Sequence, residues 1–393
     1  MPAHMPALTL TGARVLNENG LVEAPVSLAE GHIVEGSFPA IDLDGYDVLP
    51  GIVDLHGDAF ERHIAPRPSA PFPIISGLAA TDRDAAVNGV TTAWIAQSWS
   101  WEGGMRGPDF AEALLEAHAA CRGRLATDLR VQIRFETHAH DSADRLLAAV
   151  RRFGIDYVIF NNHLDEAIEM SETDPAAMAG WAGKSGKSAA ELLAIVTEAK
   201  ARAREVPRTL CRLADGFDVL GVRYGSHDDP DGETRETFAM LGARICEFPT
   251  AHQAASVACA SGDPVLMGAP NVVRGGSQAG KIAAVGLIRA GKCDALVSDY
   301  HYPALALAAF RLADMGVMDL AAAWRLISAA PAQIMGLADR GRIAPGLRAD
   351  LVVIDRATRA IEATIAGGRV SHLSGEAAAR FMGAGAGLRL AAE

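Results

Sequence analysis

Cysteine is scarce in this chain of 393 residues. The five cysteines stand at positions 121, 211, 246, 259 and 293, and no two of them form a C-x-x-C pair. An odd, dispersed set is typical of reduced thiols in the cytosol and argues against a disulfide framework.

The chain also lacks an apolar run of about 18 residues, which a membrane-spanning helix would need. Its first residues show no signal-peptide pattern. We therefore expect a cytoplasmic protein with no membrane partner.

Basic residues are in the minority. There are 36 Lys and Arg against 48 Asp and Glu, which gives a formal net charge of −12. This balance argues against a general nucleic-acid binder, but it leaves room for a local basic pocket that holds a phosphorylated small molecule. Half of the residues are hydrophobic, and 39 Gly and 19 Pro punctuate them, as is usual in a globular enzyme rich in turns.

Both ends of the chain alternate apolar and polar residues in short runs, the pattern of antiparallel strands. Such runs begin at Leu8, Ala13, Val26 and His32, and the tail has two more at 350–355 and 361–366, followed by a Gly-Gly turn at 367–368. The simplest arrangement is one small β-sandwich domain built from residues 1–48 and 341–393. A larger domain, residues 49–340, is then inserted between its halves. A short helix is expected near 375–382.

The middle of the chain alternates strand and helix patterns. Strands are expected at 52–55, 91–96, 131–136, 157–160, 219–224, 244–248, 265–267 and 295–298. Helices are expected at 109–122, 142–153, 189–205, 207–215, 233–241, 251–261 and 279–290. Eight short buried strands separated by helices over about 250 residues predict an α/β fold, a (β/α)₈ TIM barrel. An open doubly wound sheet normally carries a Gly-rich phosphate turn after its first strand, and here His56-Gly57-Asp58 occupies that place.

Imidazole and carboxylate side chains follow five of the expected strands. His56 and Asp58 stand two residues apart, on one side of an extended chain, where they could converge on a divalent metal. Active groups of a barrel sit at the carboxyl ends of its strands, and four more groups follow strands there: Glu136, His163, His227 and Asp299. Each of these groups alone is weak evidence for a metal site, because an acidic residue after a strand is often a helix N-cap. Together they predict a metal site.

The order H-x-D, Glu, His, His, Asp and the split β-domain around a barrel resemble the amidohydrolase superfamily. The tail does too, reading PAQIMGL at 331–337 and GRIAPGLRADLV at 341–352. Within the superfamily the chain most resembles the ribose 1-methylphosphonate 5-triphosphate diphosphatases of phosphonate metabolism. The stretches that carry this resemblance are PRP at 66–68, GSHDD at 225–229, EFPT at 247–250, MGAPNVVRGGS at 267–277 and SDY at 298–300.

The resemblance implies a metal-dependent hydrolase with two divalent ions (Zn, Mn or Fe). By position, His56, Asp58 and His227 resemble metal ligands, Glu136 the bridging carboxylate, His163 a ligand of the second ion, and Asp299 the aspartate that contacts metal and moves the proton. The favoured reaction cleaves the triphosphate of a ribose 1-phosphonate 5-triphosphate and releases diphosphate. Hydrolysis of a C–N bond, by a deaminase, deacetylase or cyclic amidase, is the alternative. A non-catalytic binding scaffold is a third reading.

A triphosphate ester carries about four negative charges and therefore needs hydrogen-bond donors. The donors that we expect are the side chains of Arg67, Arg274 and Lys281 and the backbone amides of Gly275, Gly276 and Ser277. These amides would open a helix at Ala279, which is a natural place for an anion. The chain departs from the family pattern at His56-Gly57-Asp58, at 162–166 (NHLDE) and at Lys281, so its substrate could differ. Residues 181–187 are expected to form a mobile loop or lid, and the protein is expected to be a homodimer.

Overall fold

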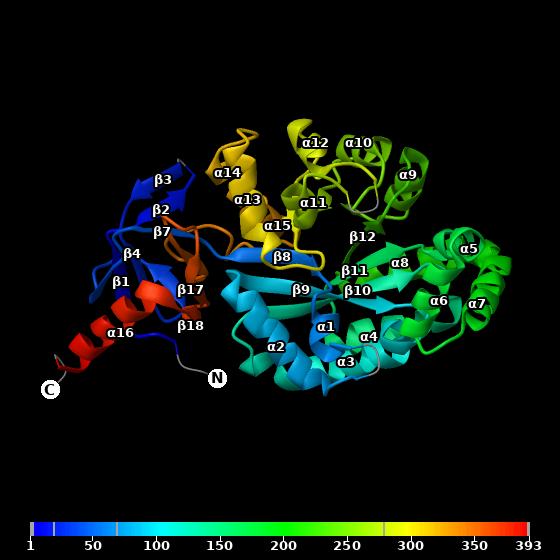
Figure 1. Ribbon diagram of the computed structural model, residues 1–393, viewed down its shortest axis with the longest axis horizontal. Helices are drawn as coiled ribbons and strands as arrows, with labels where there is room; N and C mark the ends of the chain where they lie inside the picture. The colour runs from blue at the N-terminus through cyan, green and yellow to red at the C-terminus, as the bar shows by residue number, and fades with distance from the viewer. Residues whose placement is uncertain (1–3, 19, 68–69, 278–279, 391–393) are drawn as a thin grey trace.

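The fold is a barrel of parallel strands beside a small β-domain (Figure 1). It is seen in a computed structural model that describes residues 4–18, 20–67, 70–277 and 280–390. Eight parallel strands pair in chain order: β8 Ile52–Gly57, β9 Val90–Trp99, β10 Asp128–Glu136, β11 Tyr157–Asn161, β12 Arg223–His227, β13 Ile245–Glu247, β14 Val265–Gly268 and β15 Ala295–Val297. A parallel bridge between Gly57 and Asp299 returns the last strand to the first. The predicted (β/α)₈ barrel is thereby confirmed.

Helices follow these strands and surround the barrel (Figure 1), except that the helix at 329–334 packs Ala332 against the interior core of the barrel. They are α1 Phe60–Ile64, α2 Ile74–Val87, α3 Pro108–Cys121, α4 Ala143–Phe153, α5 Leu164–Thr173, α6 Pro175–Lys184, α7 Ala189–Ala201, α8 Val206–Leu220, α9 Gly232–Met240, α10 His252–Ala260, α11 Ala269–Arg274, α12 Ala284–Arg289, α13 Ala304–Asp314, α14 Leu320–Arg325 and α15 Ala329–Ile334. Alternation along the strands divides the core. In β8, Val53 and Leu55 pack inside the barrel, whereas Ile52 packs against the helices.

Both ends of the chain form the small β-domain, as predicted. Its four-stranded sheet has the order β5-β4-β1-β6, from β1 Leu8–Thr11, β4 Val26–Ala29, β5 His32–Val34 and β6 Ala40–Asp42. Its six-stranded sheet has the order β18-β17-β16-β7-β2-β3, from β2 Arg14–Asn17, β3 Gly20–Glu23, β7 Tyr46–Pro50, β16 Leu351–Asp355, β17 Ile361–Ala366 and β18 Arg369–Leu373. The sheets share one core, in which Leu10 packs with Val48 and Ile365. Helix α16, Gly375–Leu390, follows β18.

Three segments differ from expectation. The fifth strand was expected at 219–224, but Val219 and Leu220 end helix α8, because the apolar face at Leu213 and Phe217 extends this helix up to its left-handed cap at Gly221. The fifth strand then starts at Arg223. The helix expected from 279 begins only at Ala284, and residue 279 lies outside the described residues. The expected loop at 181–187 begins inside α6, and it packs on the barrel because Trp181 Nε1 donates to Glu102 Oε2 at 2.5 Å. Among the described helices, none is long and apolar enough to cross a membrane.

Candidate functional site

Two imidazoles and a carboxylate meet at the carboxyl end of the barrel. His56, His227 and Glu247 end β8, β12 and β13, and one ligand atom of each lies within 4.8 Å of the others. Glu247 Oε2 is 2.9 Å from His56 Nδ1 and 2.7 Å from His227 Nδ1. All three side chains are buried. Glu247 was missed by the sequence analysis, although its signal was the same as for the other groups: an acidic residue at the end of an expected strand.

The Glu247 carboxylate is held in place on both oxygens. Its Oε1 accepts hydrogen bonds from Gln132 Nε2 at 3.0 Å and from the Tyr157 hydroxyl at 3.1 Å. Burial would raise the pKa of Glu247, but the neighbouring imidazoles of His56 and His227 outweigh burial and hold the pKa below its usual value. The group is therefore a carboxylate at neutral pH, and its Oε2 faces both imidazoles.

A second carboxylate–imidazole pair lies on the next strands. Glu136 ends β10, and its Oε1 lies 2.5 Å from Nδ1 of His163, the residue that precedes α5. The His163 backbone N–H also donates to Glu136 Oε2 at 3.2 Å. Burial would raise the pKa of Glu136, but the charge and hydrogen bonds of His163 lower it. The structure thus brings Glu136 and His163 into direct contact, and their expected roles as metal ligands stay a prediction.

The two predicted aspartates meet where the barrel closes. The Asp299 N–H donates to the His56 carbonyl at 3.0 Å, and the Asp58 N–H donates to the Asp299 carbonyl at 2.8 Å. Burial, followed by the charge of Asp58, raises the pKa of Asp299 to about 6. Among the described residues, the group of ligand atoms within 4.8 Å includes neither aspartate. Both nevertheless line the same cavity as His56, His163 and His227.

The donor set fits a divalent cation. His56 Nδ1 is buried and lies 2.9 Å from Glu247 Oε2, without the alignment of a hydrogen bond in the described part of the chain. A bound cation would take both atoms as ligands. Burial lowers the pKa of His227, which favours the neutral imidazole that binds metals. Imidazole with carboxylate suits Zn, Mn or Fe. His56, His227 and Glu247 could hold one ion, and Glu136 and His163 lie close enough to each other to share another.

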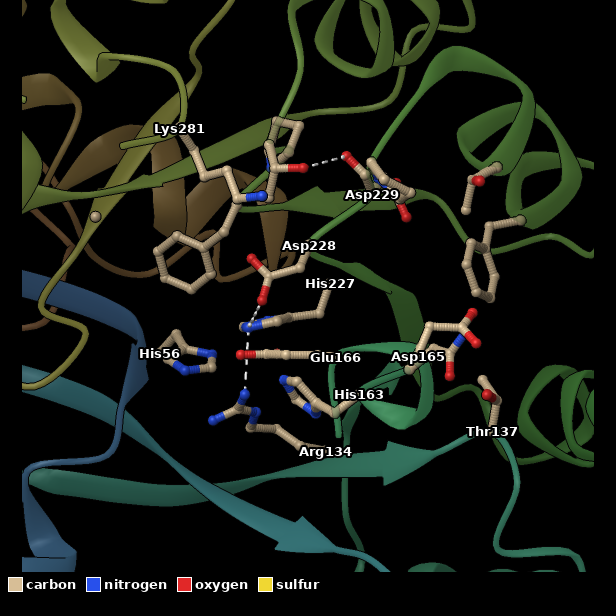
Figure 2. Close-up of a pocket in the computed structure, with 18 of the residues that line it drawn as sticks. His56, Arg134, Thr137, His163, Asp165, Glu166, His227, Asp228, Asp229 and Lys281 are labelled. Carbon is tan, nitrogen blue, oxygen red and sulfur yellow. Dashed lines mark hydrogen bonds and ion pairs between the residues drawn. The ribbon is translucent and has the colours of Figure 1, made fainter. Parts of the chain in front are cut away.

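A cavity of about 1460 Å³ opens above these groups (Figure 2). Arg274, Gly276, Ser277 and Lys281 line it, as predicted for phosphate ligands, whereas Arg67 is exposed and lies outside the lining, as does Gly275. The N–H groups of Gly275 and Gly276 both donate to the Asn271 carbonyl, at 3.1 and 3.0 Å, because residue 275 closes α11 in the left-handed conformation. Their use in this cap counts against the predicted backbone anion site.

The chain matches the model of the amidohydrolase family over residues 126–371. It therefore belongs to this family of hydrolases. It is 30% identical over 368 residues to alpha-D-ribose 1-methylphosphonate 5-triphosphate diphosphatase of Escherichia coli K12, covering 89% of this chain and 95% of that protein. The resemblance seen in the sequence is thus confirmed.

Solved structures of several hydrolases share the fold. N-acetylglucosamine-6-phosphate deacetylase from Pasteurella multocida superposes with a TM-score of 0.62 at 10% identity, over 93% of this chain and 99% of that chain. The A. niger ochratoxinase gives 0.63 at 12% identity, over 94% and 96%. At these identities the likeness shows the fold alone.

Proposed function

We propose that this protein is a metal-dependent hydrolase that cleaves the triphosphate of a ribose 1-phosphonate 5-triphosphate and releases diphosphate. The observation that carries the proposal is the composition of one cavity. The imidazoles of three histidines and the carboxylates of two aspartates line it together with the positive charges of three basic residues: His56, His163, His227, Asp58, Asp299, Arg134, Arg274 and Lys281. A polyphosphate ester needs both kinds of group, and the identity with the E. coli diphosphatase supports this substrate class.

The predicted histidines and acidic residues, together with Arg274 and Lys281, each have a place in this reaction. His56, His227 and Glu247 would hold one cation, and Glu136 and His163 would hold the other, with Asp58 beside them; Zn, Mn or Fe would suit both places. Such ions lower the pKa of water and stabilise charge on a phosphoryl oxygen. Asp299 accepts the proton of the attacking water on a carboxylate oxygen and passes it to the leaving group. Arg274 and Lys281 bind the phosphate chain from the cavity wall.

A screen of the metal-loaded protein tests this proposal against hydrolysis of a C–N bond. Triphosphate esters, cyclic amides and amino-purines would be supplied in parallel, while diphosphate and ammonia release are measured. We expect diphosphate from the triphosphate esters, and loss of that activity when a chelator removes the metal. Ammonia or amine release without diphosphate would reverse the assignment. Absence of both bound metal and turnover would favour a binding scaffold.

Light scattering of the same sample tests the proposed homodimer.

A further inference from the structure

Arg134 stands in the mouth of the barrel, where the sequence analysis expected no cation. It lies on β10 between Gln132 and Glu136, and alternate residues of a strand share a side. Its Nη2 lies 3.3 Å from His227 Nε2 (Figure 2). With the Asn161 amide turned so that its oxygen faces Arg134, this oxygen accepts from Nε at 3.2 Å and from Nη2 at 3.1 Å. The guanidinium therefore lies directly against a candidate metal ligand.

This guanidinium has no direct counter-ion in the described part of the chain, where no carboxylate oxygen lies within 4.0 Å of it. Two other buried arginines are paired: Arg235 lies 3.4 Å from Asp263, and Arg340 lies 2.7 Å from Asp128. Arg134 contacts a neutral amide and an imidazole instead. A partly buried charge is costly unless an opposite charge meets it. An anionic ligand in the cavity would supply that charge.

The donors of Arg134 suit a phosphoryl group. Arg134 Nη2 faces Nε2 of His227, whereas the other ring nitrogen of this imidazole, Nδ1, lies 2.7 Å from Glu247 Oε2. Nη1 makes no hydrogen bond with any described residue, and Arg134 lines the cavity. Guanidinium groups present their N–H donors in a fork that matches two phosphoryl oxygens. The aspartates that line the cavity would repel a polyphosphate, and the positive charge of Arg134 offsets this repulsion.

We propose that Arg134 is a substrate-binding residue that holds a phosphoryl group of the triphosphate next to the metal ligands. This inference rests on the proposed function and deepens it. Arg274 and Lys281 bind other parts of the phosphate chain from the cavity wall, whereas Arg134, beside His227, contacts the phosphoryl group nearest the reacting bond. A substrate of a C–N hydrolase with no such anion would leave Arg134 without a counter-ion.

Calorimetry of inorganic phosphate binding to the full-length, metal-loaded protein tests the proposal. Inorganic phosphate is the probe, because a polyphosphate would strip metal from the site. Arg134→Gln should weaken phosphate binding about 10- to 100-fold, the range of a charge-assisted hydrogen bond, while metal content stays that of the wild type. Arg130→Gln is the matched control. Arg130 lies on the same strand at the opposite end of the barrel, paired with Asp156 at 2.8 Å, and this variant should bind phosphate normally.

Each outcome has one meaning. Equal phosphate affinity in wild type and Arg134→Gln would overturn the role of Arg134, while diphosphate release by the wild type would leave the proposed function standing. If the wild type neither binds phosphate nor releases diphosphate, both proposals fail. If Arg134→Gln does not fold, Arg134→Lys replaces it in the experiment, because lysine keeps the positive charge but lacks the paired N–H donors of a guanidinium group. Weaker phosphate binding by this variant at full metal content supports the proposal. Loss of metal from both variants would make Arg134 structural and overturn it.

Discussion

Single residues at the barrel mouth adopt a backbone conformation that most side chains avoid. Asp228, Phe248 and Asp299 have φ of 59°, 51° and 55°, and they lie just past the ends of β12, β13 and β15. A residue other than glycine held there costs roughly 1–3 kcal/mol, and such strain concentrates at functional sites. The strained turns directly follow His227 and Glu247 and hold Asp299 itself. The backbone thus bends where the candidate site is assembled.

Glu247→Gln tests the centre of this arrangement. The amide keeps the size of the side chain but removes the negative charge that faces both His56 and His227. We expect metal affinity to fall about 10- to 100-fold, as is usual when a carboxylate that ligates or orients ligands is lost. Metal content after dialysis, measured by mass spectrometry, checks this.

A surface carboxylate provides the control for that experiment. Glu116→Gln removes a carboxylate whose ion pair with Arg152 is exposed on both sides, and such pairs contribute little. Its metal content should equal that of the wild type. Full metal occupancy in Glu247→Gln would show that the carboxylate neither binds nor positions the metal ligands.

At the scale of elements, irregular strands decide where side chains point. The pairing of β8 with β9 shifts register between Asp54 and Gly57, and bulges of this kind re-aim side chains beside active sites. Simple alternation from Val53 and Leu55 would therefore misplace His56. In β12, Gly225 lies so close to β13 that a Cβ atom would collide with the Ile245 carbonyl oxygen. A glycine is required there for the strand that ends in His227 to pair with the strand that ends in Glu247.

Gly225→Ala should therefore destabilise the barrel by about 1–3 kcal/mol or more, the usual cost of overpacking. Because the clash is with backbone, no side chain can rotate away to relieve it. Thermal unfolding of the variant, followed by circular dichroism, measures the effect.

Gly180→Ala is the control for Gly225→Ala, because a Cβ at Gly180 on α6 meets no atom within 4 Å. Alanine in a helix is favoured over glycine by about 0.5–1 kcal/mol, so this variant should melt at or slightly above the wild-type temperature. An unchanged melting temperature in Gly225→Ala would contradict the close approach of β12 and β13.

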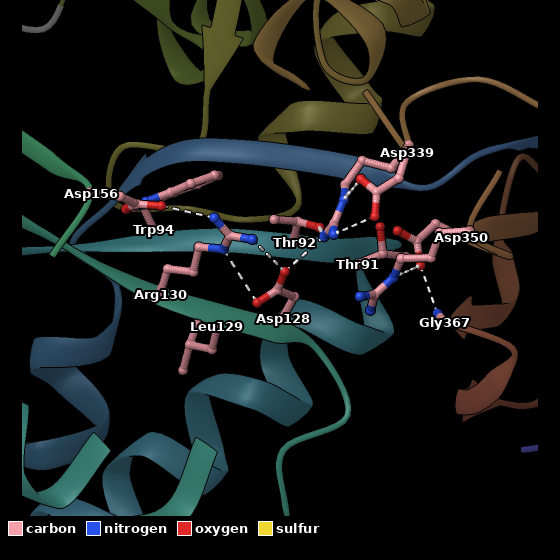
Figure 3. Close-up of polar contacts among 12 residues, drawn as sticks. Thr91, Thr92, Trp94, Asp128, Leu129, Arg130, Asp156, Asp339, Asp350 and Gly367 are labelled. Carbon is pink, nitrogen blue, oxygen red and sulfur yellow. Dashed lines mark hydrogen bonds and ion pairs between the residues drawn. The ribbon is translucent and has the colours of Figure 1, made fainter. Parts of the chain in front are cut away.

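At the scale of the whole molecule, a partly buried polar network at the amino end of the barrel ties it to the C-terminal segment (Figure 3). Arg340 Nη1 donates to Asp128 Oδ2 at 2.7 Å and to Thr92 Oγ1 at 2.8 Å. Arg130 Nη2 donates to the same Asp128 oxygen at 3.0 Å. Burial would raise the pKa of Asp128, but Arg130 and then Arg340 outweigh it and lower the pKa below the ordinary 3.8.

Arg340→Gln should lower the melting temperature near neutral pH, since it removes charged hydrogen bonds that contribute roughly 1–3 kcal/mol. The sign of the pH dependence follows from the lowered pKa of Asp128. The stability that ionised Asp128 contributes is fully present above the pKa of this group in the unfolded chain. It disappears as the pH falls through the lower pKa of Asp128 in the folded protein. The difference in melting temperature between wild type and variant should therefore shrink as pH drops from 5 to below 3.8.

Arg342→Gln is the control for Arg340→Gln. Arg342 lies two residues away and is exposed, 3.5 Å from Glu18, and an exposed pair of this kind contributes little. Its melting temperature should follow the wild type at every pH. A difference between wild type and Arg340→Gln that stays constant down to pH 3 would exclude Asp128 as the titrating group.

The sequence by itself determined the order of the barrel strands, seven of the barrel helices and the joining of both chain ends in one β-domain. Apolar runs of strand length separated by helical patterns are local signals, so all eight barrel strands and the two-ended β-domain were predicted from them. Histidines and acids that follow strands could be found in the same way. The error at 219–224 had a local cause, because the apolar face of α8 and the start of β12 adjoin there.

Only the tertiary structure decided which side chains meet. Glu247 carried the same signal as Glu136, but its position between His56 and His227 depends on how β13 closes against β12 and across to β8. Arg134 had no motif at all. Whether an arginine inside a strand is paired or faces a cavity depends on strand ends that lie far away in the sequence, and only folding brings those groups within reach of one another.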